Sequence, residues 1–449
     1  YMFTSSVRRD GYSAFGTSNP RATFFSVAAA WTFTNEKFFK WEPMTTGKLR
    51  LSWGQNGNRA LGDPYLALAN LGAGVGATMG YIDNNGVLIQ YRYLTVGRLA
   101  NPNLHWEKTE SFNAGLDFGF LNNRITGSID YYITPTVDMI MNRSLPGFTG
   151  FGSITTNLGQ VENRGFELSI NSQNIRNKDF SWNTTFGFSK YKNTIQHLYY
   201  VYDNVLDAQG NVIGVRERND IANGWFIGEP ISAIWNYKVT GIWQAHEAEE
   251  AARFGQSPGD PKVANNYTAD DKQNPNGTTT PVYNDNDKEF LGQTAPPVMT
   301  SMRNDFTYKN WNFSFNIYSY WGHKSLSGAY LHQDNATSLV ANLAKAYAKD
   351  YWTLENPTND FARLDAKGPA GVNSPGMLFD RSFIRLENVT LSYTLPQRFL
   401  SRWAIERVKV YSAVRNVAVW AKDKNWDYWD VETGGLAPRT YTLGLNVGF

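Results

Sequence analysis

Apolar and polar residues alternate along much of this chain, and the pattern is clearest at residues 439–449. Every second position there is apolar: Tyr441, Leu443, Leu445, Val447 and Phe449. The positions between them are small or polar, which predicts a β-strand with one apolar and one polar face. The last strand of an outer-membrane barrel must stay paired, because lipid cannot satisfy an open backbone. We therefore expect this stretch to be the closing strand of a barrel.

The same period of two recurs upstream. Strands are predicted at residues 1–9, 23–33 and 48–53, and paired strands at 112–120 with 125–133, 166–171 with 180–189, 302–308 with 311–317, and 389–395 with 408–414. In the pairs one face is broad and aromatic, whereas the other is small, polar and poor in Lys. Such a polar face indicates the inside of a wide transmembrane barrel rather than the outside of a soluble sandwich.

Connections between these segments differ in length at the two ends. Short turns occur at residues 121–124, 172–179 and 309–310, and long loops at 54–103, 135–157, 192–297, 323–380 and 421–438. Short periplasmic turns and long extracellular loops are typical of outer-membrane barrels. Loops of such length are expected to carry function.

Strand direction limits the number of strands in the wall. Consecutive wall strands alternate in direction across the membrane. If residues 180–190 run outward and 302–308 run inward, a single additional wall strand cannot lie between them. The strand-like residues 231–243 are therefore assigned to the extracellular loop, which leaves twelve wall strands and a periplasmic C-terminus. A plugged transporter has about 22 strands. The sequence thus predicts the C-terminal part of a longer chain, with about ten strands before residue 1.

Composition agrees with a membrane barrel. The 449 residues include 15 Trp, 25 Tyr and 27 Phe, yet the mean hydropathy is −0.44. Aromatic girdles on amphipathic strands explain both values, although a large secreted all-β protein remains an alternative. The net charge of +2 gives no sign of nucleic-acid binding, and the absence of Cys excludes disulfides and thiolate metal sites. No apolar run approaches the ~18 residues of a membrane helix.

Several stretches together resemble one known family. They are residues 6–16 (SVRRDGYSAFG), 49–58 (LRLSWGQNGN), 101–138 (NPNLHWEKTESFNAGLDFGFLNNRITGSIDYYITPTVD), 157–168 (NLGQVENRGFEL), 304–312, 383–396 (FIRLENVTLSYTLP) and 438–449 (PRTYTLGLNVGF). The chain is similar over essentially its whole length to the C-terminal barrel region of SusC/RagA-type TonB-dependent outer-membrane transporters.

The resemblance implies an importer of oligosaccharides or oligopeptides in the outer membrane of a Gram-negative bacterium. It also implies an N-terminal plug and a TonB-contacting segment outside this sequence, and a SusD-like surface lipoprotein as a lid. Such pairs can assemble further as dimers. The resemblance also implies that the terminal strand is the assembly signal of the barrel, through Tyr441, Leu443, Leu445, Val447 and Phe449. The energy would come from the inner-membrane proton gradient through TonB, and no cofactor is implied.

Two segments depart from the family pattern. Members often carry a G-Y-D-P-E-like run after the penultimate strand, where this chain has Asn425, Trp426, Asp427, Tyr428, Trp429 and Asp430. Many also carry a D-x-N-x-D-G loop that resembles a calcium loop. The corresponding residues between Asp270 and Asp287 have disrupted spacing, and a calcium site needs several oxygens at one point. We therefore predict no metal site there and favour a solvated acidic loop.

Candidate chemistry points to binding rather than catalysis. The five His are scattered without metal-ligand spacing, and no nucleophile or phosphate-binding motif is present. The polar wall face carries Asp117, Asp130 and Glu167. They could guide cargo or hold the plug, and we favour contact with the plug because it fills most of a transporter's lumen.

Loop aromatics are the predicted cargo-binding residues: Trp225, Phe226, Trp235, Trp243, Trp426, Tyr428 and Trp429. Aromatic rings stack on sugars and also bury peptide side chains, so they do not identify the cargo. The alternative is that they pack the loops together or form the interface with the lid protein. Two other functions also stay open: a siderophore or vitamin receptor without a lid, and a passive porin or surface adhesin.

Overall fold

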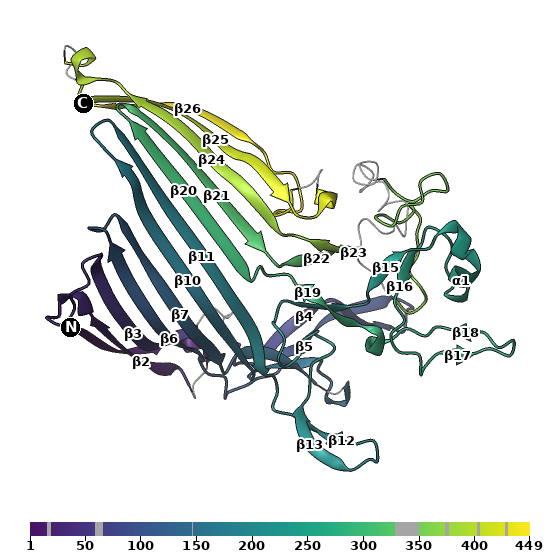
Figure 1. Cartoon of the computed structure of the whole chain (residues 1–449). Coiled ribbons are helices and arrows are strands. Elements are labelled where there is room, and N and C mark those ends of the chain that lie inside the picture. The colour runs from purple at the N-terminus through teal and green to yellow at the C-terminus, as the bar shows by residue number, and fades with distance from the viewer. Residues whose placement is uncertain are drawn as a thin grey trace.

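A computed structural model of the chain describes residues 1–15, 19–58, 66–145, 147–327, 350–372, 377–401, 405–426 and 430–449. Twelve of its strands form one antiparallel sheet in the order β1-β2-β3-β6-β7-β10-β11-β20-β21-β24-β25-β26. Figure 1 shows this sheet as a curved wall with the additional two-stranded sheets gathered at one end. The predicted all-β barrel wall and its twelve strands are confirmed.

Most wall strands are longer than the sequence pattern predicted, whereas β2 has the predicted length with shifted bounds and β26 is shorter. Their bounds are β1 Met2–Gly11, β2 Arg21–Trp31, β3 Met44–Asn58, β6 Glu107–Phe120, β7 Ile125–Val137, β10 Gln160–Arg176, β11 Phe180–His197, β20 Val298–Tyr308, β21 Trp311–Trp321, β24 Phe383–Thr394, β25 Arg407–Ala421 and β26 Thr440–Gly448. A tilted strand needs ~9–11 residues to cross a membrane. Strands β10 and β11, with 17 and 18 residues, therefore extend beyond it.

Short turns join the strands at one end of the wall. Leu121, Asn122 and Asn123 adopt φ values of 54°, 56° and 60° between β6 and β7, and Lys309 adopts 51° between β20 and β21. This left-handed region is tolerated best by Asn and Gly, which explains the Asn pair in the first turn. The predicted turns at residues 121–124 and 309–310 are confirmed.

Small two-stranded sheets lie in the connections at the other end. They are β4 Asn70–Ile82 with β5 Leu88–Arg98, β8 Ile140–Ser144 with β9 Ser153–Asn157, β12 Tyr202–Leu206 with β13 Val212–Glu217, β14 Ala233–Asn236 with β19 Glu289–Gln293, β15 Val239–Ile242 with β16 Pro261–Val263, β17 Lys272–Gln273 with β18 Thr279–Thr280, and β22 Lys324–Ser327 with β23 Met377–Asp380. Residues 233–242 thus lie outside the wall, as strand direction predicted. The pairing of β4 with β5 was not predicted, since residues 54–103 were expected to be a loop.

Among the residues that the structure describes, helical structure is confined to short segments. They are the helix α1 Ala248–Arg253 and the 3₁₀ turns η1 Ser13–Phe15, η2 Phe33–Asn35, η3 Gly147–Thr149, η4 Ala245–Glu247, η5 Asp285–Asp287, η6 Gln397–Phe399 and η7 Lys424–Trp426. Within the described ranges, every helix is too short or too polar to cross a membrane.

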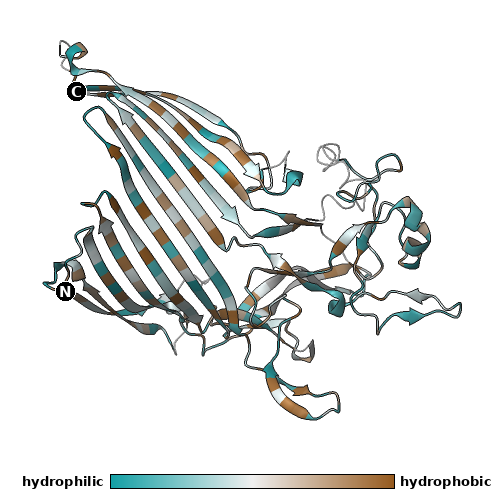
Figure 2. Cartoon of the chain, in the orientation of Figure 1, coloured by the Kyte–Doolittle hydropathy of each residue, from teal (hydrophilic) through white to brown (hydrophobic). Residues whose placement is uncertain are grey.

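The two faces of the wall differ in polarity. Figure 2 shows hydrophobic and hydrophilic bands that alternate along the wall strands. Apolar side chains of the outer face are exposed, such as Leu51 at 54% and Leu391 at 45%. In contrast, the larger buried clusters lie among the rim and loop segments, for example Phe15, Phe24 and Trp106. A wall that meets lipid leaves its apolar residues on the outside, as the alternation predicted.

Candidate functional site

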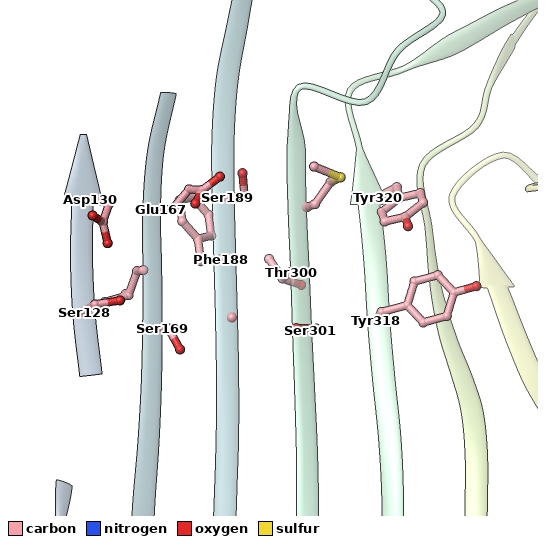
Figure 3. A pocket seen from close by; sticks show the side chains of 13 residues that line it. Ser128, Asp130, Glu167, Ser169, Phe188, Ser189, Thr300, Ser301, Tyr318 and Tyr320 are labelled. Carbon is pink, nitrogen blue, oxygen red and sulfur yellow. The ribbon is translucent and has the colours of Figure 1, made fainter. Parts of the chain in front are cut away.

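A recess on the inner face of the wall spans strands β7 to β21 (Figure 3). Strand register builds it from two rows of directly opposed residues. One row is Ser128, Ser169, Gly187, Ser301 and Tyr318, and the other is Asp130, Glu167, Ser189, Met299 and Tyr320. These rows line a volume of about 380 Å³ together with Leu168, Phe188 and Thr300.

The lining of the recess suits the binding of polar, partly apolar groups. Hydroxyl groups offer both donors and acceptors, and tyrosine rings add flat apolar surfaces. Glu167 is exposed, and it makes no ion pair with any residue that the structure describes. It is therefore available to a positively charged or hydrogen-bonding group that enters the lumen.

Arg50 joins Asp117 and Asp130, the other two carboxylates that the sequence assigned to the inner face. Its Nε donates to Asp117 Oδ1 over 2.9 Å, and a terminal nitrogen donates to Asp130 Oδ1 and Oδ2 over 3.0 and 3.1 Å. Gly115 lies between Arg50 and Asp130 in the register, and a Cβ there would approach both side chains to within 2.6 Å. The missing side chain of Gly115 lets the guanidinium reach across β6.

Sequence reasoning identified the acids of this cluster but missed Arg50. The available signal was its position between Leu49 and Leu51, which places it on the polar face with Asp117. Which charged residues face each other on neighbouring strands depends on the strand register, and a single sequence does not reveal that register. Arg50 pairs with both Asp117 and Asp130, and Lys48 lies 3.8 Å from Asp117, so Glu167 is the one of the three that makes no ion pair among the described residues.

The last loop is tied to the inner wall by buried charges. Arg385 on β24 donates to Asp430 Oδ2 over 2.6 Å, and both side chains are nearly inaccessible, at 3% and 4% exposure. Glu432 accepts a 2.6 Å hydrogen bond from the Tyr318 hydroxyl and lies 3.2 Å from Arg385 Nε. The loop therefore meets the wall beside the end of the recess.

A β-bulge positions these groups. The register shifts between Leu386 and Asn388, and Asn416 on the facing strand adopts φ 52°. The Asn416 side chain accepts a hydrogen bond from Arg385 and donates to the carbonyl of Ala437 over 3.0 Å. The extra residue in the strand redirects side chains toward the loop, a common use of bulges.

Asp430 is held in its charged form. Burial alone would raise the pKa of its carboxyl, but the Arg385 guanidinium and the N–H groups of Thr433 and Glu432 outweigh this and lower the pKa. Both of these amides donate to Oδ1 over 3.0 Å. The last loop therefore folds around the Asp430 carboxylate, whose two oxygens both accept hydrogen bonds.

The predicted cargo-binding aromatics of the long β11–β20 connection occupy different environments. Trp225 packs against a buried cluster that includes Ile195 and Leu198. Phe226 contacts Trp235 and Phe290 with ring centroids 4.7 and 5.0 Å apart, and Lys288 Nζ lies 4.7 Å from the Trp235 ring centre. Trp235 and Phe226 are half-buried rather than covered.

Trp243 requires a correction. Its side chain is fully buried, and its Nε1 donates to Gln256 Oε1 over 2.9 Å. It belongs to a body formed by residues 237–263 and residues 350–372, which we call the loop body. Asp260 and Arg363 link these two segments through a 3.0 Å ion pair. Trp243 has no free face for cargo, so the packing alternative describes it.

The aromatics of the last loop are only partly described. Trp426 donates from Nε1 to the carbonyl of Asp380 over 2.9 Å and contacts Phe379 with ring centroids 5.9 Å apart. It also lines a recess of about 480 Å³ beside Asp430 and Arg439. Tyr428 and Trp429 lie outside the described residues, and their role stays a prediction.

Carboxylates of the 270–287 loop are engaged by the loop itself. Asp287 is fully buried and accepts from the N–H groups of Tyr267 and Asn284, each over 2.9 Å. Asp271 accepts from Asn265 and from the N–H of Val282. No group of three or more potential protein ligands for a metal occurs among the described residues. These oxygens stabilise turns rather than converge on one point.

A buried carboxylate holds the base of the β12–β13 hairpin. Glu217 is 7% exposed and accepts from the N–H groups of Leu198 and Tyr200, each over 2.8 Å, while His197 Nδ1 lies 2.8 Å from its second oxygen. Burial raises the pKa of Glu217, but the hydrogen bonds from these three residues outweigh burial and leave the pKa below its usual value.

This arrangement predicts acid-induced loosening of the hairpin base. Because the folded pKa of Glu217 is depressed, its contribution to stability is full above the unfolded pKa of about 4.5 and is lost as pH falls through the folded pKa. Amide exchange at Leu198 and Tyr200, corrected for intrinsic rates, should accelerate on acidification. Glu217→Gln should remove most of this pH dependence. Equal protection at neutral and acidic pH in the unmodified protein would contradict the prediction.

The apolar row of the final strand lies on the outer face. Val410 and Val414 of β25 pair with Leu445 and Tyr441 of β26. Tyr441, Leu443, Leu445 and Phe449 are exposed at 64% or more, and Val447 at 37%. This exposure agrees with a lipid-facing strand. The assembly role of these five residues stays a prediction.

Comparisons with known proteins agree with this architecture. The family described as TonB dependent receptor-like, beta-barrel, matches residues 1–255. TonB-dependent receptor P3 of Formosa agariphila is 30% identical over 467 residues, which cover 100% of this chain and 44% of that protein. TonB-dependent receptor SusC of Bacteroides thetaiotaomicron is 30% identical over 474 residues, which cover 100% of this chain and 42% of that protein. The chain thus spans less than half the length of these relatives.

A solved structure shares the fold along the whole chain. The structure of the RagAB peptide transporter superimposes with a TM-score of 0.74 at 22% identity, and the match covers 100% of this chain and 46% of the other. The structure of the RagAB peptide importer in the open-open state superimposes with a TM-score of 0.73 at 23% identity, and the match covers 100% of this chain and 45% of the other.

Proposed function

The chain belongs to the TonB-dependent receptor-like β-barrel family, and on this premise we propose that it is part of an active importer of oligosaccharides or oligopeptides. TonB would supply the energy, and a SusD-like surface lipoprotein would cover the extracellular mouth. The observation that carries the proposal is the twelve-strand wall, because its sequence aligns from end to end with SusC and its fold with the RagAB transporter.

The chain is an outer-membrane barrel wall of a Gram-negative bacterium. Its outer face is apolar and its inner face carries charges and hydroxyl groups, as a lumen separated from lipid requires. The long-loop end is extracellular and the short-turn end is periplasmic in such barrels.

In the proposed importer the inner recess contacts the plug. A plug fills most of a transporter lumen, and the recess offers it Glu167 and a surface of hydroxyl and tyrosine side chains. Asp117 and Asp130 would contribute less directly, because Arg50 already binds both. Contact with moving cargo is the alternative role for the same surface.

Cargo capture belongs to the extracellular end in this proposal. Phe226, Trp235 and Trp426 retain partial exposure and are the described candidates. Tyr428 and Trp429, which lie outside the described residues, stay candidates from the sequence. Aromatic faces serve sugars and peptides equally, so the cargo class rests on similarity. The structural relative is named for peptides, which favours peptide as the first cargo to test.

Uptake by intact cells tests the proposal. Cells with the natural full-length protein should accumulate a fluorescent oligopeptide or oligosaccharide, and collapse of the proton gradient should abolish this accumulation. A small solute that diffuses through porins serves as the control and should enter equally in both conditions. Cargo accumulation that continues unchanged without the gradient would contradict active import and favour a passive porin.

Copurification distinguishes the other alternative. A SusD-like lipoprotein recovered with the transporter would exclude a siderophore or vitamin receptor without a lid. Recovery of the barrel alone from intact outer membranes, combined with binding of an iron chelate, would favour that receptor. A surface adhesin predicts neither gradient-dependent uptake nor iron-chelate binding.

A further inference from the structure

A buried histidine lies where the wall meets the last loop, which connects β25 to β26. His323 is located between β21 and β22, outside the wall strands, and is only 5% exposed. Its ring contacts the rings of Tyr320 and Phe383, with centroids 6.4 and 6.5 Å away. Its Nδ1 is buried and has no hydrogen-bond partner among the residues that the structure describes. Such surroundings favour the neutral form of an imidazole.

Arg381 connects His323 to the last loop. Its backbone N–H donates to the carbonyl oxygen of His323 over 2.9 Å. Its Nε donates to the carbonyl oxygen of Val431 over 2.9 Å, and a terminal nitrogen donates to the carbonyl oxygen of Glu432. One residue therefore contacts both the histidine and two successive carbonyl groups of the last loop.

Phe383 connects His323 to a second arginine. The Phe383 ring is fully buried, and Arg385 Cζ lies 5.4 Å from its centre. Arg385 in turn holds the buried carboxylate of Asp430. A proton on His323 would add a third cation to a region that already contains the guanidinium groups of Arg381 and Arg385. A buried cation without a paired anion is costly.

The carboxylate that attracts a proton on His323 already has partners. Asp380 accepts hydrogen bonds from Lys422 Nζ over 2.7 Å and from the N–H of Ser382 over 2.8 Å. Burial and the Arg381 charge outweigh the attraction of Asp380 and lower the pKa of His323 below its ordinary value of 6.5. Protonation is therefore opposed in the closed structure and becomes favourable once the region opens.

We propose that His323 is a pH-sensitive switch that releases the last loop from the inner wall in a mildly acidic external medium. The long loops of such a barrel are exposed to that medium. Because the pKa of His323 is lowered in the closed structure, the opened loop binds one more proton. The closed state therefore has its full stability above pH 6.5 and loses stability as the pH falls below 6.5 toward the lowered pKa.

Release of the last loop would also change the inner recess. Glu432 accepts a 2.6 Å hydrogen bond from the hydroxyl group of Tyr318, and Tyr318 lines the recess. An opened loop leaves this hydroxyl free to bind another group in the lumen. The switch thus connects the external pH to the surface that the lumen presents.

Hydrogen exchange of the natural full-length protein between about pH 7.5 and 5.5 tests the switch. The amides of Glu432 and Thr433, which donate to Asp430, report opening of the loop. After correction for intrinsic rates, opening should increase on acidification by up to about tenfold per pH unit, the limit for uptake of one proton. Asp430 stays charged over this range, because its pKa is lowered.

His323→Phe separates the histidine from other titrating groups. A phenyl ring keeps an aromatic contact with Tyr320 and Phe383 but cannot bind a proton, and the backbone carbonyl that accepts from Arg381 is retained. Protection of the last loop should then be equal at both pH values. His246→Phe is the matched control, because His246 is exposed in η4 and its replacement should leave the full pH dependence.

A second measurement covers the case in which His323→Phe folds poorly. Deuterium exchange at the imidazole C2 position, followed by mass spectrometry of the unmodified protein, gives the pKa of His323 itself. A pKa below 6.5 together with acid-dependent opening supports the proposal. A pKa at or above 6.5, unchanged protection on acidification, or equal pH dependence in His323→Phe and the unmodified protein would each overturn it.

Discussion

Replacing Trp243 by alanine is expected to destabilise the loop body by about 3–5 kcal/mol. The ring is completely buried, contacts Phe254 at a centroid distance of 5.2 Å and lies 4.2 Å below the Lys262 ammonium. Its loss would also leave Gln256 Oε1 without the Trp243 donor. The twelve wall strands should be unaffected, because their antiparallel ladder does not include this residue.

Limited proteolysis of the variant in outer membranes is the direct measurement. Cleavage within residues 237–263 and 350–372 should become faster, while the barrel keeps its heat-modifiable migration. Trp243→Phe retains an apolar ring and should have a smaller effect. Trp235→Ala is the control at a half-buried ring of the same connection. If Trp243→Ala left proteolysis unchanged but abolished cargo binding, a direct role in cargo capture would be restored.

Replacing Arg385 by alanine is expected to release the last loop from the inner wall. Removing one partner of a buried ion pair typically costs about 3–5 kcal/mol, because the remaining charge is left uncompensated. Here the remaining charge is Asp430, at 4% exposure, and Glu432 loses a neighbouring cation at 3.2 Å. The loop would open rather than keep Asp430 charged and unpaired.

Hydrogen exchange of the last loop measures this release. The amides of Glu432 and Thr433, which donate to Asp430, should lose protection in Arg385→Ala. Arg415→Ala is the matched control, because Arg415 pairs with Glu387 on the exposed wall surface, where an ion pair contributes only ~0–1 kcal/mol. Retained protection in Arg385→Ala would show that backbone contacts alone hold the loop.

The wall could be predicted because the alternation of apolar and polar residues that defines it lies within each strand. Residues 112–120 and 439–449 show a strict period of two, which only an extended chain with two different environments explains. Strand direction then placed residues 231–243 outside the wall without any knowledge of the loop structure. The length of β3 was underestimated, because Gly54 to Asn58 carry no apolar alternation and join the sheet through backbone pairing.

The candidate sites were predicted less well. Asp130 and Glu167 were assigned to the correct face, but their place in one row with Ser189, Met299 and Tyr320 depends on the register of five strands. Trp243 was expected to be a cargo ligand because a loop tryptophan looks the same in sequence whether it is exposed or buried. Its ring packs against Phe254, Gln256 and Lys262 of the same segment, and the Asp260–Arg363 ion pair joins that segment to residues 350–372.

The sequence alone therefore determined the wall: its strand number, its two faces and its short-turn and long-loop ends. These properties follow from the alternation of side chains between the two faces of a strand. That alternation is visible in the sequence of each strand, without knowledge of the strand that pairs with it. Only the tertiary structure decided which side chains meet. The Arg50 cluster and the Arg385–Asp430 pair exist because register sets particular residues opposite one another, and a shift of one residue would separate them.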